Sequence, residues 1–398
     1  MPQLSKKSAN MPASPIRKLV PSADVAVQKG LNVYYLNIGQ PDIPSPVNAL
    51  AALQDWDIPV ISYTRSEGTV EYREALVDYF HSKGFSDLDI SNFVVTNGGS
   101  EALMFALGLI ANPGDEIIIP EPFYANYNGF AVQSEVNVVP ISSDIESGFA
   151  LPPIVDFEKK ITEKTRAIVI CHPGNPTGYL YSKEELDQLR DLVLKYDLYL
   201  ISDEVYREFT YDIPHYSVLN YPELKNHVIV IDSESKRFSM CGIRLGAMIS
   251  RNKELMAAAL KFAQARLSPV LISQVIATAA HKDSVQYLQH AKAEYDSRRN
   301  YIVKALNQIP GVFVPKPQGA FYCVARLPVE DAEHFAQWML EEFDYKGETV
   351  MVAPNAGFYS TSGKGKNEVR IAYVLEIEEL EKAVVVLAAG LEAYQNRD

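Results

Sequence analysis

Short apolar, β-branched runs recur along the chain from about residue 90 to residue 230, and helical patterns lie between several of them. The clearest helix spans Ser182–Tyr196, where Ser182 and Glu185 form a capping-box pattern and apolar residues recur every three to four positions. Strands that alternate with helices predict an α/β fold with a mainly parallel sheet flanked by helices. The predicted strands are Phe93–Thr96, Glu116–Pro120, Ala167–Cys171, Leu198–Ser202 and Val228–Asp232.

The pattern changes near residue 290. Residues 291–309 (AKAEYDSRRNYIVKALNQI) predict a long charged helix, the segments GAFYCVARL and EVRIAYV predict short strands, and Ile377–Tyr394 predicts a closing helix. We therefore expect a large domain over residues 46–290 and a smaller α+β domain over residues 291–398. Residues 1–45 are expected to form an N-terminal arm that packs with the small domain.

Composition and charge exclude several classes of function. The formal net charge of −13 argues against nucleic acid or an anionic membrane as the main partner. Cys171, Cys241 and Cys323 lack the spacing of a metal site or a disulfide framework, which fits a reducing cytoplasm and no bound metal. The N-terminal lysines are not followed by an apolar run, so no signal peptide is expected, and no stretch is long enough to span a bilayer.

Chemically active residues follow each predicted strand. In an open parallel sheet, ligands bind outside the carboxyl ends of the strands. One site assembled from five loops explains this distribution better than five unrelated loops. The segments are residues 97–100 (NGGS), 121–124 (EPFY), 172–178 (HPGNPTG), 203–206 (DEVY) and 233–236 (SESK).

Lys236 follows a buried strand, where a lysine is costly unless it is paired or covalently used. Ser233 leaves room for a ligand and can donate to phosphate oxygens, and Arg244 supplies a fixed positive charge for a phosphate. Gly99 and Ser100 open a helix whose free N–H groups form an anion site. The alternatives are an ordinary loop lysine and an ordinary capped turn.

Asp203 stands where its carboxylate can reach inward and hold a pyridine nitrogen protonated, as pyridoxal 5′-phosphate (PLP) requires of an enzyme. Tyr206 can place its hydroxyl beside the same ring, and the Asn175 amide can donate to a phenolate oxygen. A helix cap for Asp203 and a simple turn for Asn175 remain the plain alternatives.

In combination these motifs resemble the class I/II aminotransferases, which have fold type I of the PLP enzymes. The resemblance runs from LNIGQPD at residue 36 to VRIAY at residue 373, and includes YTRSEGTVEYREAL, TNGGSEAL, PGNPTG, SDEVYREF and SESKRFSMCGIRLG. It implies that Lys236 binds PLP as a Schiff base and that Asp203 pairs with the pyridine nitrogen. Asn175 and Tyr206 would bond the 3′-oxygen. The residues implied for the phosphate are Gly99, Ser100, Ser233 and Arg244.

The same resemblance implies roles outside the cofactor's polar contacts. Tyr124 would stack on the ring, Arg370 would clamp the substrate α-carboxylate, and the Gly39 backbone would approach that carboxylate. Tyr63 would reach the phosphate of a neighbouring subunit, so a homodimer with shared active sites is expected. The sequence departs from the family pattern at Cys241 and Ile243 and in the segment APNAGFY, residues 353–359.

The expected reaction is a ping-pong transfer of an amino group from an L-amino acid to a 2-oxo acid. Aspartate or glutamate is favoured as donor, with Arg17 or Arg266 as candidate partners for a distal carboxylate. An aminotransferase for aromatic or other amino acids, and a carbon–sulfur β-lyase, share the same machinery and remain alternatives. A ligand-sensing domain would need an attached DNA-binding segment, for which residues 1–30 are too short.

Overall fold

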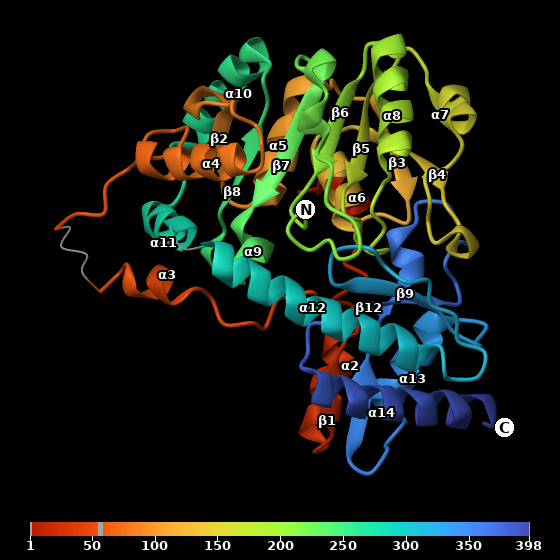
Figure 1. Ribbon diagram of the computed structural model, residues 1–398. Helices are drawn as coiled ribbons and strands as arrows, with labels where there is room; N and C mark the ends of the chain where they lie inside the picture. The colour runs from red at the N-terminus through yellow and green to blue at the C-terminus, as the bar shows by residue number, and fades with distance from the viewer. Residues whose placement is uncertain (1, 55–58, 283, 398) are drawn as a thin grey trace.

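A seven-stranded sheet forms the centre of the larger part of the molecule (Figure 1). The computed structural model describes residues 2–54, 59–282 and 284–397. The strand order is β2-β8-β7-β6-β5-β3-β4, and β8 pairs antiparallel with both of its neighbours while the other pairs are parallel. The mainly parallel α/β fold is thereby confirmed. The strands are β2 Phe93–Thr96, β3 Glu116–Glu121, β4 Asn137–Ser142, β5 Thr165–Cys171, β6 Tyr199–Asp203, β7 Val228–Ser233 and β8 Gly246–Ile249.

Helices cover both faces of this sheet because its strands carry apolar residues on both sides. On β3, Ile118 packs into the core cluster beneath α4, α7, α8 and α11, whereas Ile117 and Ile119 pack into the cluster beneath α5, α6 and α10. The helices are α4 Val70–Ser82, α5 Gly99–Ile110, α6 Asn126–Gln133, α7 Ile154–Lys160, α8 Lys183–Tyr196, α10 Lys253–Arg266 and α11 Leu271–Lys282. A short helix, α3 Val47–Ala51, packs on α11.

The five strands read from the sequence all occur, each within two residues of its expected bounds. The expected helix also occurs as α8, with Ser182 as N-cap and a reciprocal capping box to Glu185. The sequence analysis did not identify β4 or β8. β4 contains Pro140, which cannot donate to a ladder, and the strand lies at the edge of the sheet, where that loss is tolerated.

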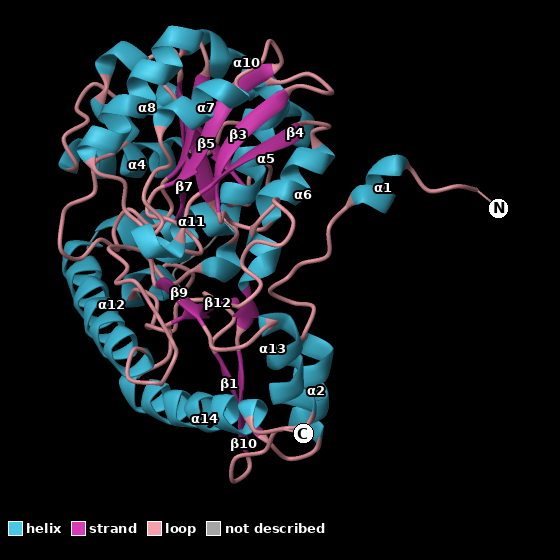
Figure 2. Ribbon diagram, turned by 90° about the vertical axis from the view of Figure 1, so that its right-hand side faces the viewer, coloured by secondary structure: helices cyan, strands magenta, loops and turns pink. Residues whose placement is uncertain are grey.

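The smaller part of the molecule combines the N-terminal segment with the C-terminal third (Figure 2). β1 pairs in parallel with β10, and β11-β12-β9 form an antiparallel sheet whose buried face shares one core with α2, α13 and α14. The elements are α2 Val20–Gln28, β1 Asn32–Tyr35, β9 Tyr322–Arg326, α13 Ala332–Glu341, β10 Glu348–Met351, β11 Ala353–Pro354, β12 Glu368–Ala372 and α14 Ile377–Gln395.

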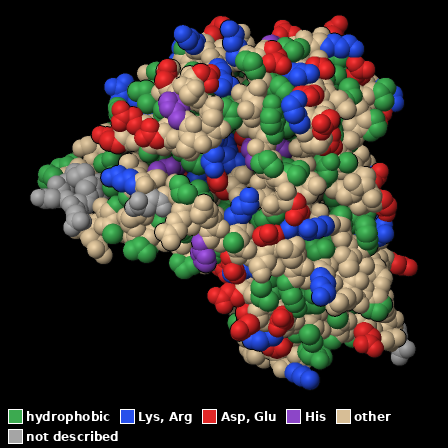
Figure 3. Space-filling view, in the orientation of Figure 1, with side chains coloured by type: hydrophobic (Ala, Val, Ile, Leu, Met, Phe, Trp, Pro, Cys, Tyr) green, Lys and Arg blue, Asp and Glu red, His purple; other side chains and the backbone are tan. Residues whose placement is uncertain are grey.

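The helix α12, Ser284–Leu306, runs between the two parts, so the expected boundary at residues 290/291 falls inside one continuous helix. The first helix, α1 Lys6–Asn10, lies instead beside α6 of the larger part, where the Lys7 ammonium is 2.6 Å from the Glu135 carboxylate. In the described ranges, no helix combines the length and apolar character needed to cross a bilayer. Acidic and basic side chains are interspersed over the face shown in Figure 3.

Candidate active site

Lys236 lies in the one-turn helix α9, Glu234–Arg237, which follows β7 directly. Its Nζ donates to the backbone carbonyl of Gly39 at 2.9 Å and lies 3.7 Å from the Cys241 sulfur. Gly39 comes from the N-terminal segment, and a Cβ there would lie only 1.8 Å from the Tyr322 hydroxyl oxygen. The absence of a side chain at Gly39 therefore lets three segments that are far apart in the sequence meet at Lys236.

Asp203 is the last residue of β6, and its carboxylate is buried. The Tyr127 hydroxyl donates to Oδ2 at 2.8 Å, and the backbone N–H of Val205 points at Oδ1 at 3.4 Å. Burial raises the pKa of Asp203 to about 6, and the nearby carboxylates of Asp232 and Glu204 act in the same direction. Asp203 is thus a carboxylate poised to pair with a cationic group in the site.

Hydroxyl and amide groups connect the sheet edge to the smaller part of the molecule. The Asn175 amide nitrogen lies 3.4 Å from the Tyr206 hydroxyl, which lies 3.0 Å from the Tyr322 hydroxyl. Tyr322 also points at the Gly39 carbonyl at 3.3 Å. These side chains line the region that Asp203 and Lys236 approach.

Arg370 on β12 is a buried cation, with a relative exposure of 1%. One Nη donates to the Asn175 side-chain oxygen at 3.0 Å and the other to the Asn37 carbonyl. Its guanidinium carbon lies 4.7 Å from the Tyr322 ring centroid and 4.9 Å from that of Phe358. Burial lowers the pKa of Arg370 below its usual value. Within the described residues no carboxylate pairs with this guanidinium, so the site holds an uncompensated positive charge.

The start of α5 and the loop before β8 together form an anion cradle. Gly98 caps α5 with φ +83°, and a Cβ there would lie 2.6 Å from Nη2 of Arg244. Gly99 and Ser100 occupy the first helical positions, whose backbone N–H groups have no partner within the helix. Glycine at position 98 thus permits the Arg244 guanidinium to approach these N–H groups. The guanidinium and the N–H groups both favour the binding of a phosphate. Ser233 is the last residue of β7, the strand that pairs with β8, and its Oγ lies 3.0 Å from that of Ser235.

The two arginines considered for a distal carboxylate differ in their surroundings. The Arg266 guanidinium bonds Glu101 at 2.7 Å, and the backbone carbonyls of Ser66 and Val95 at 3.0 and 3.1 Å. Arg266 therefore holds the start of α5, and its guanidinium is occupied by the protein itself instead of being free for a substrate. Arg17 is exposed and forms no ion pair within the described residues.

Tyr124 and Tyr63 differ sharply in burial. Burial raises the pKa of Tyr124 to about 12, while the cations of Arg370 and Arg17 act in the opposite direction. Arg17 therefore acts electrostatically on Tyr124, as Arg370 does. Tyr63 is 81% exposed in the single chain, beside the exposed Ile61.

Three residues of the site were not singled out by the sequence analysis. Tyr127 lies on the helix after residues 121–124, Tyr322 lies in GAFYCVARL, and Asn37 lies in LNIGQPD. Asn37 and Tyr322 fall inside motifs that the analysis quoted, which was the available signal. Tyr127 carried no such signal, because its contact with Asp203 spans 76 residues.

Comparisons with known proteins show the family to which the chain belongs. The family model for aminotransferases of class I and II matches residues 32–387. A putative aminotransferase of Bacillus subtilis, YugH, is 35% identical over 360 residues, covering 89% of this chain and 90% of that protein. An aspartate aminotransferase of Pyrococcus horikoshii is 32% identical over 368 residues, or 91% of each chain.

A single mutant of the aspartate aminotransferase from Thermus thermophilus shares the fold, with a TM-score of 0.89 and 29% identity. The match covers 98% of this chain and 100% of that one. Both the family model and the relatives thus extend over nearly the whole sequence. The chain belongs to the class I and II aminotransferases, and it is an enzyme that transfers amino groups.

Proposed function

We propose that this aminotransferase uses PLP, held covalently through Nζ of Lys236. The residues present fit that group. Asp203 supplies a buried carboxylate for the pyridine nitrogen, and the start of α5 with Arg244 supplies a cradle for the phosphate. Asn175 and Tyr206 supply polar atoms for the ring oxygen of PLP. When bound, PLP supplies an electron sink for the substrate's α-carbon.

The observation that carries this proposal is the buried guanidinium of Arg370. A cation with 1% exposure and no carboxylate partner among the described residues is unfavourable in an empty site. It becomes favourable when a ligand brings a carboxylate, which guanidinium can bind in a bidentate manner. Every α-amino acid and every 2-oxo acid carries that carboxylate. Arg370 therefore accounts for the binding of both the donor and the acceptor.

The residues of this chain divide the work as follows. Arg370 and Asn175 orient the substrate carboxylate, because Asn175 already bonds Arg370 at 3.0 Å. With PLP bound, Nζ of Lys236 would be the group that takes a proton from the substrate α-carbon and returns it on the other side of the transferred nitrogen. Asp203 keeps its negative charge and holds a proton on the pyridine nitrogen. The Tyr206 hydroxyl would donate to the ring oxygen of PLP.

We propose a dicarboxylic amino acid, aspartate or glutamate, as donor. Arg17 is exposed, acts electrostatically on Tyr124 and has no carboxylate partner among the described residues, so it can receive the distal carboxylate. An ion pair of this kind would add most of the selectivity over neutral substrates. Both compared aspartate aminotransferases align over nearly all of this chain.

We also propose a homodimer whose subunits complete each other's sites. Apolar side chains are exposed near Tyr63, among them Val60 at 66% and Ile61 at 63%. Such a surface favours association, and two-fold dimers are the commonest oligomers. Tyr63 would then reach the phosphate in the partner's site. The three free cysteines fit the cytoplasm as its location.

The half-reaction tests this function directly. The protein is loaded with PLP, single amino acids are added without an acceptor, and the absorbance of the bound cofactor is followed. Conversion to pyridoxamine phosphate by aspartate or glutamate, with release of the matching 2-oxo acid, is the expected result. Preferential conversion by aromatic amino acids would overturn the substrate, and release of pyruvate with sulfide or ammonia would replace transamination by β-elimination.

A further inference from the structure

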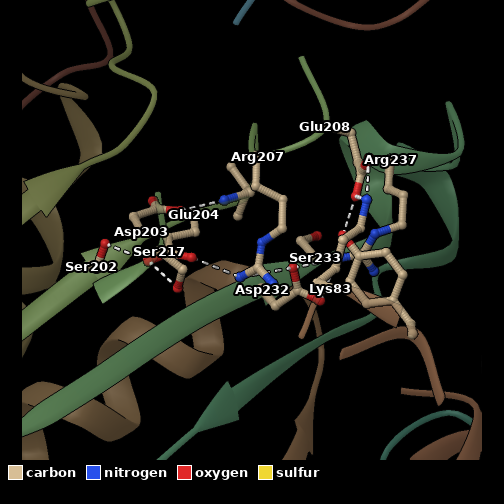
Figure 4. Close-up of polar contacts among 12 residues, drawn as sticks. Lys83, Ser202, Asp203, Glu204, Arg207, Glu208, Ser217, Asp232, Ser233 and Arg237 are labelled. Atoms are coloured by element: carbon tan, nitrogen blue, oxygen red, sulfur yellow. Dashed lines mark hydrogen bonds and ion pairs between the residues drawn. The ribbon is translucent and has the colours of Figure 1, made fainter. Parts of the chain in front are cut away.

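Glu204, Arg207, Asp232 and Arg237 form a cluster of buried charges on strand β7 and on the segments that follow β6 and β7 (Figure 4). Nη2 of Arg207 lies 3.1 Å from Glu204 Oε2 and 3.8 Å from Asp232 Oδ1. Nη2 of Arg237 donates to Asp232 Oδ2 at 2.7 Å. The side chains of all four residues are at most 5% exposed. Interactions among them are therefore screened little by solvent.

Arg207 contributes its charge to this cluster without well-oriented hydrogen bonds. None of its three guanidinium nitrogens makes a hydrogen bond to another described residue, although Nη2 is at ion-pair distance from both carboxylates. Its guanidinium carbon lies 4.5 Å from the centroid of the Phe80 ring. A buried cation with so few bonds is costly for stability, which argues for a role in the electrostatics of the site.

The two carboxylates that Arg207 faces both act on Asp203. Burial is the main reason that the pKa of Asp203 is raised to about 6, and Asp232 and Glu204 raise it further. Three donors point at Glu204 Oε1: the hydroxyls of Ser202 and Ser217 and the backbone N–H of Val218. The Glu204 carboxylate, next to Asp203 in the chain, is fully buried and faces Arg207 as its counterion.

We propose that Arg207 is a positioning residue that keeps Asp203 ionised at neutral pH by neutralising Glu204 and Asp232. The inference rests on the proposed role of Asp203 as partner of the pyridine nitrogen, since only an ionised carboxylate can hold that nitrogen protonated. Arg207 does not contact the site itself. The titratable groups that face Asp203 from the surrounding elements are Tyr124, Tyr127, Cys171, Glu204, Tyr206 and Asp232.

The test measures binding of pyridoxamine phosphate to the full-length apoprotein as a function of pH. This ligand has the pyridine ring but no aldehyde, so Lys236 contributes no covalent bond. In the wild type we expect binding to weaken as pH falls through about 6, where Asp203 takes up a proton. In Arg207→Met, Glu204 loses its cation while Asp232 keeps Arg237, and the midpoint should move up by about one pH unit. Arg207→Lys retains the charge and should leave the midpoint in place.

The double variant Arg207→Met/Glu204→Gln removes one charge of each sign and should return the midpoint to the wild-type position. A folded Arg207→Met protein with an unshifted midpoint would overturn the proposal, as would a double variant that keeps the shift. If Arg207→Met does not fold, the pH midpoint of the single variant Glu204→Gln tests the proposal instead. That variant leaves Arg207 in excess and should lower the midpoint, and an unchanged midpoint would count against the proposal.

Asp203→Asn separates this inference from the proposed function. The ligand's own phosphate titrates alike in every variant, so only differences between variants report on the protein. If Asp203→Asn binds pyridoxamine phosphate with the same affinity and pH dependence as the wild type, the role assigned to Asp203 fails. If Asp203→Asn removes the transition while Arg207→Met leaves it unshifted, only the role of Arg207 fails.

Discussion

Replacing Arg370 with methionine should separate activity from stability. The variant removes the two charge-assisted hydrogen bonds that the guanidinium would make to the substrate α-carboxylate. Each bond of this type contributes about 1.5–3 kcal/mol, so the loss is about 3–6 kcal/mol of transition-state binding. That corresponds to a fall of about 10²–10⁴-fold in kcat/KM. The fall should be alike for every amino acid, because all of them share the α-carboxylate.

The same substitution should leave the fold intact or stabilise it. Arg370 is buried and has no acidic partner among the described residues, so its desolvation is not offset by an ion pair. Methionine of similar length can fill the space between Tyr322 and Phe358. What the fold loses is the hydrogen bond to Asn175, the hydrogen bond to the Asn37 carbonyl and two contacts with aromatic rings. We expect a free energy of unfolding within about 1–2 kcal/mol of the wild-type value.

The assay combines steady-state kinetics with several amino acids and urea unfolding of the same preparations. Arg326 is a matched control, since it lies on the neighbouring strand β9, is partly exposed and pairs with Glu146. Arg326→Met should change kcat/KM less than twofold. The reasoning would be refuted if Arg370→Met lost less than tenfold in kcat/KM, or if it lost activity only in proportion to a large loss of stability.

Three further predictions follow from the same structure. Lys236→Ala should still bind PLP non-covalently but lose at least about 10³-fold in turnover, and full activity would exclude Lys236 as the proton carrier. Arg17→Met should lower kcat/KM about tenfold for aspartate and glutamate but not for alanine, and an equal loss for all three would remove Arg17 from specificity. Burial lowers the pKa of both His172 and His215 from 6.5 to about 3. Because both stay neutral in the fold, their contribution to stability is complete above pH 6.5 and is lost as pH falls toward 3, by about 2.7 kcal/mol per pH unit together. Urea midpoints should fall accordingly between pH 6 and 4, and His215→Gln should halve that slope; an unchanged slope would contradict it.

The local pattern of the chain predicts the central sheet well. Strands such as β2 are buried on both faces and therefore read as short apolar runs between turn residues. The capping box of α8 marks its start within the sequence itself. β8 has only four residues, GAMI, and its antiparallel pairing depends on neighbours distant in sequence. A run of four residues does not indicate whether the strand is parallel or antiparallel to its neighbours. Only the tertiary structure shows the antiparallel pairing of β8.

Part of the candidate site could also be predicted from the sequence. Lys236 and Asp203 were predicted because each comes directly after or at the end of an apolar strand, and the parallel topology places those strand ends at one edge of the sheet. The surroundings of Arg17 and Arg266 could not be predicted from the sequence. Both are cations in polar segments, yet only the fold shows that Arg266 is bound to Glu101 and two backbone carbonyls.

By itself, the sequence determined the fold class and pointed to the sheet edge, the lysine, the aspartate and the arginine that we propose for the chemistry. The fold class follows from local periodicity, and Lys236 and Asp203 are residue types that are costly to bury without a partner. The arginine, Arg370, was implied by the family resemblance. Only the tertiary structure decided which groups surround them: Tyr127 on Asp203, Tyr322 against Gly39, and Arg207 between two carboxylates. Such contacts join elements far apart in the chain, and their distances are set by how the two parts of the molecule pack.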